Sequence, residues 1–206
     1  MSDTSFRIRV YFEIKGRLAL LSHLELARAL ERMVRRAELP YQISQGFSPH
    51  MKIAFGSALP VGIGGLRECF DLQITRYIAP DKILDALCAQ GTDDLKALSV
   101  DYIDKRYPAA SVAFPLSRYQ VVFSSPLKRE LLVPESLTVI RKKKERELIV
   151  SEYLIDGPTL NGTELSFSLL AKPTGSLRPD VFLSALLGQD SDAEILSFMR
   201  IDQQSA

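Results

Sequence analysis

The stretch 44–52, SQGFSPHMK, gathers side chains whose types and spacing could bind a ligand. They are an amide, an aromatic ring, an imidazole and an amine, on a backbone constrained by a glycine and a proline: Gln45, Gly46, Phe47, Pro49, His50 and Lys52. Because bases stack on aromatic rings and phosphates pair with cations, this combination is typical of loops that hold single-stranded nucleic acid. The alternative is that Phe47 packs on the edge of a sheet and His50 caps a strand.

His50 is also the one candidate for a catalytic group, because an imidazole can act as a general base. The neighbouring sequence offers it no evident partner. A catalytic role would therefore depend on a residue that the fold brings close to it.

Four arginines recur at helical spacing. Offsets of four, seven and eight residues place them on one helix face, opposite a stripe of Leu and Met: Arg28, Arg32, Arg35 and Arg36. The segment 6–55 holds nine Lys or Arg and four Asp or Glu, so it carries +5 while the remainder of the chain carries −4. Such a basic surface favours a partner with a phosphate backbone. The alternative is a solvated helix face on which Glu25 and Glu31 pair with neighbouring arginines.

A further basic run occupies 141–146, where the pattern predicts the turn of a hairpin. Its cations begin with Arg141, Lys142, Lys143 and Lys144. Together with the arginine helix, this turn could form two walls of one cationic groove. The alternative is that exposed lysines only keep the strand edges from aggregating.

The elements that must position these residues follow from periodicity. Alternation of apolar and polar residues over 8–14 predicts a strand, and Ser22 with Glu25 forms a capping-box pattern that starts a helix over 24–38. The rest of this half is predicted as two strands, a helix and a strand: 51–59, 68–76, 80–91 and 97–105. This order is the split βαβ arrangement of a ferredoxin-like fold.

A weaker version of the same order follows the linker 108–115. It is predicted as a strand, a short helix bounded by prolines, a strand with a hairpin, a strand, a helix and a strand: 118–124, 126–134, 137–154, 164–171, 179–187 and 195–201. The predicted fold class is therefore α+β, with two tandem ferredoxin-like (split βαβ) halves and antiparallel sheets. The first half spans 1–107, and the second, a degenerate copy, spans 116–202.

Composition limits the number of domains, the class of protein and its partners. With 206 residues, 46% of them hydrophobic and 25% charged, the chain is expected to fold as one large domain or two small ones, and not to be disordered or fibrous. Its net charge of +1 gives no overall field for nucleic acid or an anionic membrane. No apolar run approaches the ~20 residues that span a bilayer, and the start has no signal-peptide pattern. We therefore expect a cytoplasmic protein with no membrane partner.

Metal ligands are few. No two of the two cysteines and two histidines, Cys69, Cys88, His23 and His50, share the short spacing of a metal site. Two cysteines also cannot supply a cluster motif of three thiolates for an iron–sulfur centre. We expect both cysteines to be buried thiols, with no metal or other cofactor on this chain.

The continuous segment 22–63, SHLELARALERMVRRAELPYQISQGFSPHMKIAFGSALPVGI, resembles the hallmark segment of the radical SAM-associated family. This family is a domain of unknown function found beside, or fused to, a cobalamin-binding radical SAM protein. The segments GSLRPD (175–180) and VIRKKKERELIV (139–150) are similar to its second-half signatures, so the likeness spans nearly the whole chain. The chain departs from the family after Ser125, where members usually carry a fuller helix.

The resemblance implies an accessory or substrate-presenting partner of a radical SAM enzyme, with RNA or the translation apparatus, such as the ribosome, as its target. The iron–sulfur cluster, SAM and cobalamin are then expected on the partner, which is encoded nearby or fused in relatives. No catalytic activity is expected of this chain on its own. His23 and Arg178 lie in the resembling segments and join the candidate binding residues.

The leading hypothesis is a non-catalytic module that binds RNA through the arginine helix and the 44–52 loop for a separate radical SAM enzyme. The first alternative is a metal-free RNA-processing enzyme, by analogy with the CRISPR repeat-cleaving endonucleases that also use paired ferredoxin-like domains. The second alternative is a protein-interaction subunit whose basic helix meets an acidic patch on its partner.

Overall fold

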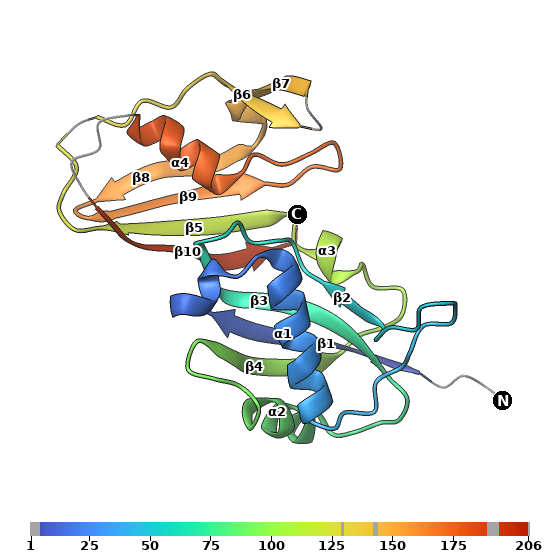
Figure 1. Ribbon diagram of the computed structural model, residues 1–206. Helices are drawn as coiled ribbons and strands as arrows, with labels where there is room; N and C mark the ends of the chain where they lie inside the picture. The colour runs from blue at the N-terminus through green and yellow to red at the C-terminus, as the bar shows by residue number, and fades with distance from the viewer. Residues whose placement is uncertain (1–4, 129, 142–143, 189–193, 206) are drawn as a thin grey trace. The chain divides into compact units, whose positions relative to one another are not determined.

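The computed structural model describes residues 5–128, 130–141, 144–188 and 194–205. The chain divides into two compact units, Met1–Phe114 and Pro115–Ala206 (Figure 1). Strands make up more of the described chain than helices do, and the strand pairs within each unit are antiparallel. The predicted α+β class with antiparallel sheets is therefore confirmed.

The sheet of the first unit is built around its first strand. Its strands are β1 (Phe6–Ile14), β2 (Ile53–Phe55), β3 (Gly64–Ile74) and β4 (Leu95–Tyr102). β1 pairs with β4 on one side and with β3 on the other, and β2 pairs with the outer side of β3. The neighbour order is thus β4-β1-β3-β2, with Val10 opposite both Phe70 and Val100.

Two helices, α1 (His23–Arg36) and α2 (Pro80–Cys88), cover one face of this sheet (Figure 1). Ile8 and Val10 of β1 are fully buried in a core that also takes Leu30 of α1 and residues of α2. The apolar side of β1 and the helix stripes therefore meet as their periodicity predicts, since alternate strand residues face one side of a sheet.

The start of α1 carries the predicted capping box. The Glu25 amide donates to Ser22 Oγ at 3.4 Å, and the Ser22 amide donates to Glu25 Oε2 at 2.8 Å. Hydrogen bonds from the Ser22 side chain and amide hold the pKa of Glu25 below its usual value. These two residues thus satisfy amides that the first turn leaves without partners.

The second unit has its own sheet. Its strands are β5 (Leu116–Phe123), β8 (Leu154–Asn161), β9 (Glu164–Leu170) and β10 (Ile195–Gln204), in the order β10-β5-β9-β8. The helix α4 (Pro179–Leu187) has the predicted bounds and packs Phe182 edge-on against Phe167 of β9 at 5.0 Å. A separate hairpin joins β6 (Ser136–Arg141) to β7 (Lys144–Ile149), and a 3-10 turn (Val150–Glu152) leads on to β8.

Several predicted elements are wrong in detail. The described residues of 126–134 form no helix, because prolines at both ends of so short a segment prevent one. The strand β8 was not predicted, since Gly157 and Pro158 interrupt its pattern. The short helix α3 (Ala110–Ala113) lies in the predicted linker. Of the two cysteines, Cys69 is buried as expected, but Cys88 is exposed at the end of α2.

Candidate nucleic-acid interface

The loop 44–52 is closed at its base by its own hydrogen bonds. The Ser44 amide donates to the His50 carbonyl at 2.8 Å, and the His50 amide donates to Ser44 Oγ at 3.1 Å. Next to this closure, Ile43 and Met51 form an isolated antiparallel bridge. The residues between the closing pair are thereby presented as a tip, with Gly46 supplying a positive φ of 143° that other residues rarely adopt.

Phe47 stands at this tip and is fully exposed. The alternative in which its ring packs on the sheet edge is therefore wrong. Gln45, Pro49 and His50 are exposed as well, whereas Met51, directly after them, is buried. A large apolar ring held in water by a braced loop is available to stack on a partner.

The His50 ring has a partner that the sequence analysis did not identify. Its Nδ1 lies 2.9 Å from Ser44 Oγ and 3.2 Å from the Ser48 carbonyl oxygen. Both contacts stay inside the loop and use the same ring nitrogen. Their clear role is to brace the loop, and they also place a hydroxyl beside the imidazole.

The four arginines of α1 all lie on the exposed side of the helix, away from Leu30 and Met33. They follow the helix over about 12 Å, from the rise per residue. Arg35 pairs with Glu31 at 3.4 Å, and the guanidinium of Arg36 donates to the Gln90 carbonyl at 3.3 Å. The Glu31 pair expected for a solvated face is thus present. Because it is exposed, it is worth under about 1 kcal/mol.

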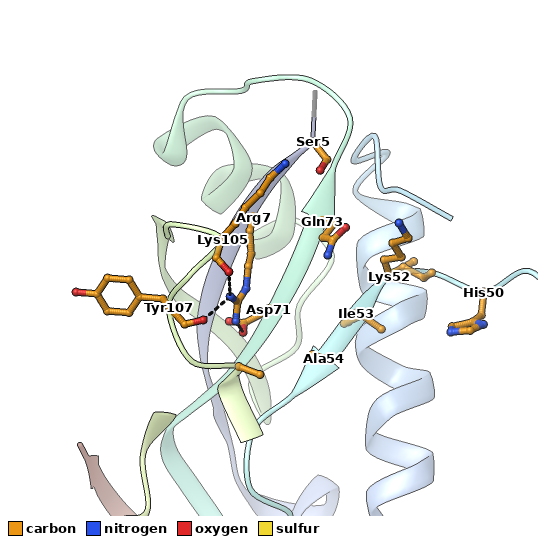
Figure 2. A pocket seen from close by; sticks show the side chains of 12 residues that line it. Ser5, Arg7, His50, Lys52, Ile53, Ala54, Asp71, Gln73, Lys105 and Tyr107 are labelled. Atoms are coloured by element: carbon orange, nitrogen blue, oxygen red, sulfur yellow. Dashed lines mark hydrogen bonds and ion pairs between the residues drawn. The ribbon is translucent and has the colours of Figure 1, made fainter. Parts of the chain in front are cut away.

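The face of the first sheet that α1 and α2 do not cover holds a cavity of about 650 Å³ (Figure 2). It is bounded by the start of β1, the end of the loop with β2, the β3 strand and the segment after β4: Ser5, Arg7, His50, Met51, Lys52, Ile53, Ala54, Asp71, Gln73, Lys105, Tyr107 and Ala109. The volume is that of a small-ligand site. Two predicted residues, His50 and Lys52, therefore meet residues that are distant in sequence.

One wall of the cavity is fixed by a buried charged cluster. Asp71 Oδ1 accepts from Arg9 Nε at 2.7 Å, and Asp71 Oδ2 accepts from Arg7 Nη2 at 2.6 Å. The same Oδ2 also accepts from Arg9 Nη2 at 3.1 Å and from the Ala110 amide at 2.8 Å. Burial by itself would raise the pKa of Asp71, but the hydrogen bonds from Arg9, Arg7 and Ala110 outweigh it and hold the pKa below its usual value.

The two arginines of this cluster also hold the segment that follows β4. Arg7 Nη1 donates to the Tyr107 carbonyl at 2.7 Å, and both guanidinium groups donate to the Pro108 carbonyl at 3.0 and 2.9 Å. The Arg9 guanidinium also lies 5.1 Å from the centre of the Phe114 ring. Its pKa is raised because Asp71 more than compensates for burial. The cluster thus ties a loop that carries Lys105 to the sheet.

Sequence reasoning missed this cluster and the wall that it holds. A signal was present, because arginines alternate with buried Ile8 and Val10 in β1 and a charged residue interrupts the buried stretch of β3. Charges on a covered strand face need partners. The partner segment is about one hundred positions away in the chain, so its position could not be predicted.

The remaining predicted residues are not brought to the cavity. The α1 arginines do not line it, and exposed His23, at the start of α1, packs edge-on against the Phe55 ring at 5.9 Å. Arg178 belongs to the second unit and pairs with Asp180 at 2.5 Å. Arg141 and Lys144 are backbone partners in the β6–β7 hairpin, whereas Lys142 and Lys143 lie outside the described residues. The predicted cationic groove stays a prediction.

The described residues contain no group of three or more His, Cys, Asp or Glu arranged to hold a metal ion. In the same part of the chain, no helix is both long and apolar enough to cross a membrane.

Comparison with known sequences gives one family. No curated protein matches the chain. One family model, described as an uncharacterized protein conserved in bacteria (DUF2344), matches residues 7–179, from β1 to the first residue of α4. This match covers the 44–52 loop, the arginines of α1 and nearly all of the cavity wall. The chain therefore belongs to the DUF2344 family of uncharacterized bacterial proteins.

Proposed function

We propose that this chain is an RNA-binding module that has no catalytic activity of its own and presents single-stranded RNA to a separate enzyme. The observation that carries the proposal is the braced 44–52 loop, which holds Phe47 fully exposed and ends at a cationic cavity. Stacking of a base on such a ring is worth about 1–3 kcal/mol and tolerates any sequence. The Lys52 amine and the His50 imidazole, at the end of the loop, can contact the phosphates on either side of that base.

The arginine face of α1 extends this proposal. Neither the Arg28 nor the Arg32 guanidinium makes an ion pair with another described residue, and Arg28 interacts with Glu25 only through the longer-range attraction that helps lower the pKa of Glu25. Two exposed guanidinium groups one helical turn apart can contact successive phosphates without first breaking internal pairs. This supports α1 as an additional phosphate-contacting surface of the same unit.

We also propose that the served enzyme is a radical SAM protein and that both units are ferredoxin-like halves. The first part rests on the resemblance of 22–63 to the radical SAM-associated family. The second is supported by the strand order, because in each unit the last strand neighbours the first, the first neighbours the third and the third neighbours the second. Co-purification of a radical SAM protein with the tagged chain from its native cells is the expected result, and repeated recovery without one would contradict this part.

RNA binding is tested by fluorescence anisotropy with an unstructured RNA of about ten nucleotides, a length within the usual range for single-strand sites. We expect Phe47→Ala to weaken binding by about fivefold to one hundredfold, from the stacking energy lost. Arg28→Ala with Arg32→Ala should weaken binding and flatten its salt dependence by about 0.7 per lost phosphate contact. The exposed Lys82 of α2 provides the control, and Lys82→Ala should bind like the unmodified chain. No RNA binding, or equal binding by the Phe47 variant, would overturn the proposal.

A second candidate function is metal-free RNA cleavage. The observation that favours it is that His50 lines the cavity and has the Ser44 hydroxyl at 2.9 Å. Cleavage of the same RNA in the presence of a chelator, lost in His50→Ala, is the result that this function requires. RNA that is bound and stays intact under these conditions rules it out.

A further inference from the structure

The cavity contains Ser5, Gln73 and Lys105, which base stacking and the backbone contacts of the loop and α1 do not use. We propose that it is a binding site for a phosphate monoester, the terminal phosphate of an RNA strand or the phosphate of a free nucleotide. Only the choice of RNA as the carrier of that phosphate rests on the proposed function. The proposal comes from the charges, the donors and the size of the cavity.

The charge balance of the cavity favours an anion. Its lining includes Arg7, Lys52 and Lys105 against a single carboxylate, Asp71. That carboxylate already accepts four hydrogen bonds, three of them from guanidinium nitrogens, so its charge is neutralised inside the wall. Because Arg7 takes part in this pairing, Lys52 and Lys105 are the cations of the lining that a ligand can use.

Two lysines are the groups that would contact the phosphate. Lys52 precedes β2 and Lys105 follows β4, and neither amine makes an ion pair with another described residue. In Figure 2 their side chains come from opposite sides of the view, with Ser5 and Gln73 labelled between them. A hydroxyl and an amide can donate to phosphate oxygens that the two amines leave free.

The ligand is a monoester because of its charge and the space available. A phosphate monoester carries about −1.5 to −2 at neutral pH, whereas each phosphodiester of an RNA backbone carries one negative charge. Two or more unpaired cations facing one cavity match the dianion better. The volume of about 650 Å³ also leaves room for the sugar or base attached to that phosphate.

The buried cluster explains how one of these lysines is kept in place. Arg7 donates to the Tyr107 and Pro108 carbonyls on the segment that also carries Lys105. Figure 2 shows this guanidinium between the segment and Asp71. The cavity wall is therefore fixed to the sheet before a ligand arrives, which lowers the entropic cost of binding.

The test compares three RNAs of one sequence, with a 5′-phosphate, a 3′-phosphate or neither, bound to the full chain. We expect one phosphorylated end to strengthen binding by about tenfold or more, as for hydrogen bonds to a charged group. This preference should be lost in the double variant Lys52→Ala, Lys105→Ala and kept in the control Lys82→Ala, Lys96→Ala, which removes two exposed lysines elsewhere in the unit. Equal affinity for all three RNAs, or a preference that survives the first double variant, would overturn the proposal.

A nucleoside monophosphate and its unphosphorylated nucleoside distinguish the two sources of phosphate. If the monophosphate binds as tightly as the phosphorylated RNA, with the same dependence on the two lysines, the cavity is confirmed with a free nucleotide as its ligand. If no RNA binds but the monophosphate does, the proposed RNA function fails and the phosphate site stands. If RNA binding depends on Phe47 but is the same with and without a terminal phosphate, the proposed RNA function is supported and the phosphate site is contradicted.

Discussion

Alternate side chains of β1 enter two different environments on the two faces of one sheet. Ile8 and Val10 point into an apolar core with α1 and α2, whereas Arg7 and Arg9 join Asp71 on the opposite face. Both environments are buried: Val10 is 0% exposed and Arg9 is 3% exposed. Apolar packing fills one face of the sheet, and paired charges fill the other.

The two faces of the sheet contribute differently to the molecule. Apolar side chains gain from burial without a specific partner, so the helix face tolerates small changes in geometry. Buried charges are stable only when each has its partners in place, so the charged face fixes the exact position of the loop after β4. The apolar face therefore supplies most of the stability, and the charged face builds one wall of the candidate site.

The largest effect on stability is expected when the Asp71 carboxylate is removed from the charged face. Asp71→Asn leaves buried Arg9 and partly buried Arg7 without a carboxylate and should lower the free energy of unfolding by about 3–5 kcal/mol. Urea denaturation measures this value. Asp85→Asn, at an exposed position of α2, is the control and should change stability by less than about 0.5 kcal/mol. A loss below about 1 kcal/mol for the Asp71 variant would show that the cluster is dispensable for folding.

The apolar face is tested at Leu30, which is 0% exposed. Leu30→Ala removes buried methyl groups and should cost about 2–5 kcal/mol in urea denaturation. Leu24→Ala on the same helix is the matched control, because Leu24 is 59% exposed and should cost little. Unlike the Asp71 variant, the folded Leu30 variant should keep the phosphate preference of the cavity. Loss of that preference would contradict the separation between the two faces.

The pH dependence of stability separates the two faces, because acid should remove only the contribution of the ionised Asp71 carboxylate. Because the folded-state pKa of Asp71 lies below the usual carboxyl value, its contribution is fully present above that usual value. It is lost as the pH falls through the depressed folded-state pKa. Urea denaturation of the original chain and of Asp71→Asn should therefore converge as the pH falls through the depressed folded-state pKa of Asp71, while Leu30→Ala keeps its deficit. A gap that stays constant into acid would contradict the assignment.

The smallest of these effects is expected at the start of α1. Ser22→Ala removes the hydroxyl of the capping box and should lower the free energy of unfolding by about 1 kcal/mol. Ser22→Thr keeps a capping hydroxyl and should retain most of the stability. Equal losses for both variants would show that packing around Ser22, and not the cap, sets its contribution.

Prediction from sequence worked best where one residue pattern determines one element. The capping box at Ser22 and the stripe through Leu30 and Met33 gave α1 within two residues at each end, and α4 matched at both ends. The helix predicted over 126–134 failed because the prolines outweighed the analogy with the first half. The strand β8 was missed because its glycine and proline hide the alternation of an edge strand.

For the candidate site, residue types were informative and positions were not. The loop was recognised from its own composition, and Phe47 is exposed as the proposed base stacking requires. From the sequence, the loop and the α1 arginines were expected to form one RNA-binding surface. In the structure the loop instead opens on a cavity with Lys105 and Gln73, which lie on other elements.

Only the fold showed that Phe47 is exposed at the tip of the 44–52 loop. The sequence alone specifies which residues form α1, the alternation of apolar and polar residues in β1 and the constrained backbone of that loop. These depend on local spacing, capping and backbone restriction, which act over a few residues. Only the tertiary structure decided that Arg7 and Asp71 hold the segment after β4 and that Lys52 and Lys105 line one cavity. The reason is physical: a buried charge requires a partner, but its own sequence does not specify which distant backbone groups will supply one.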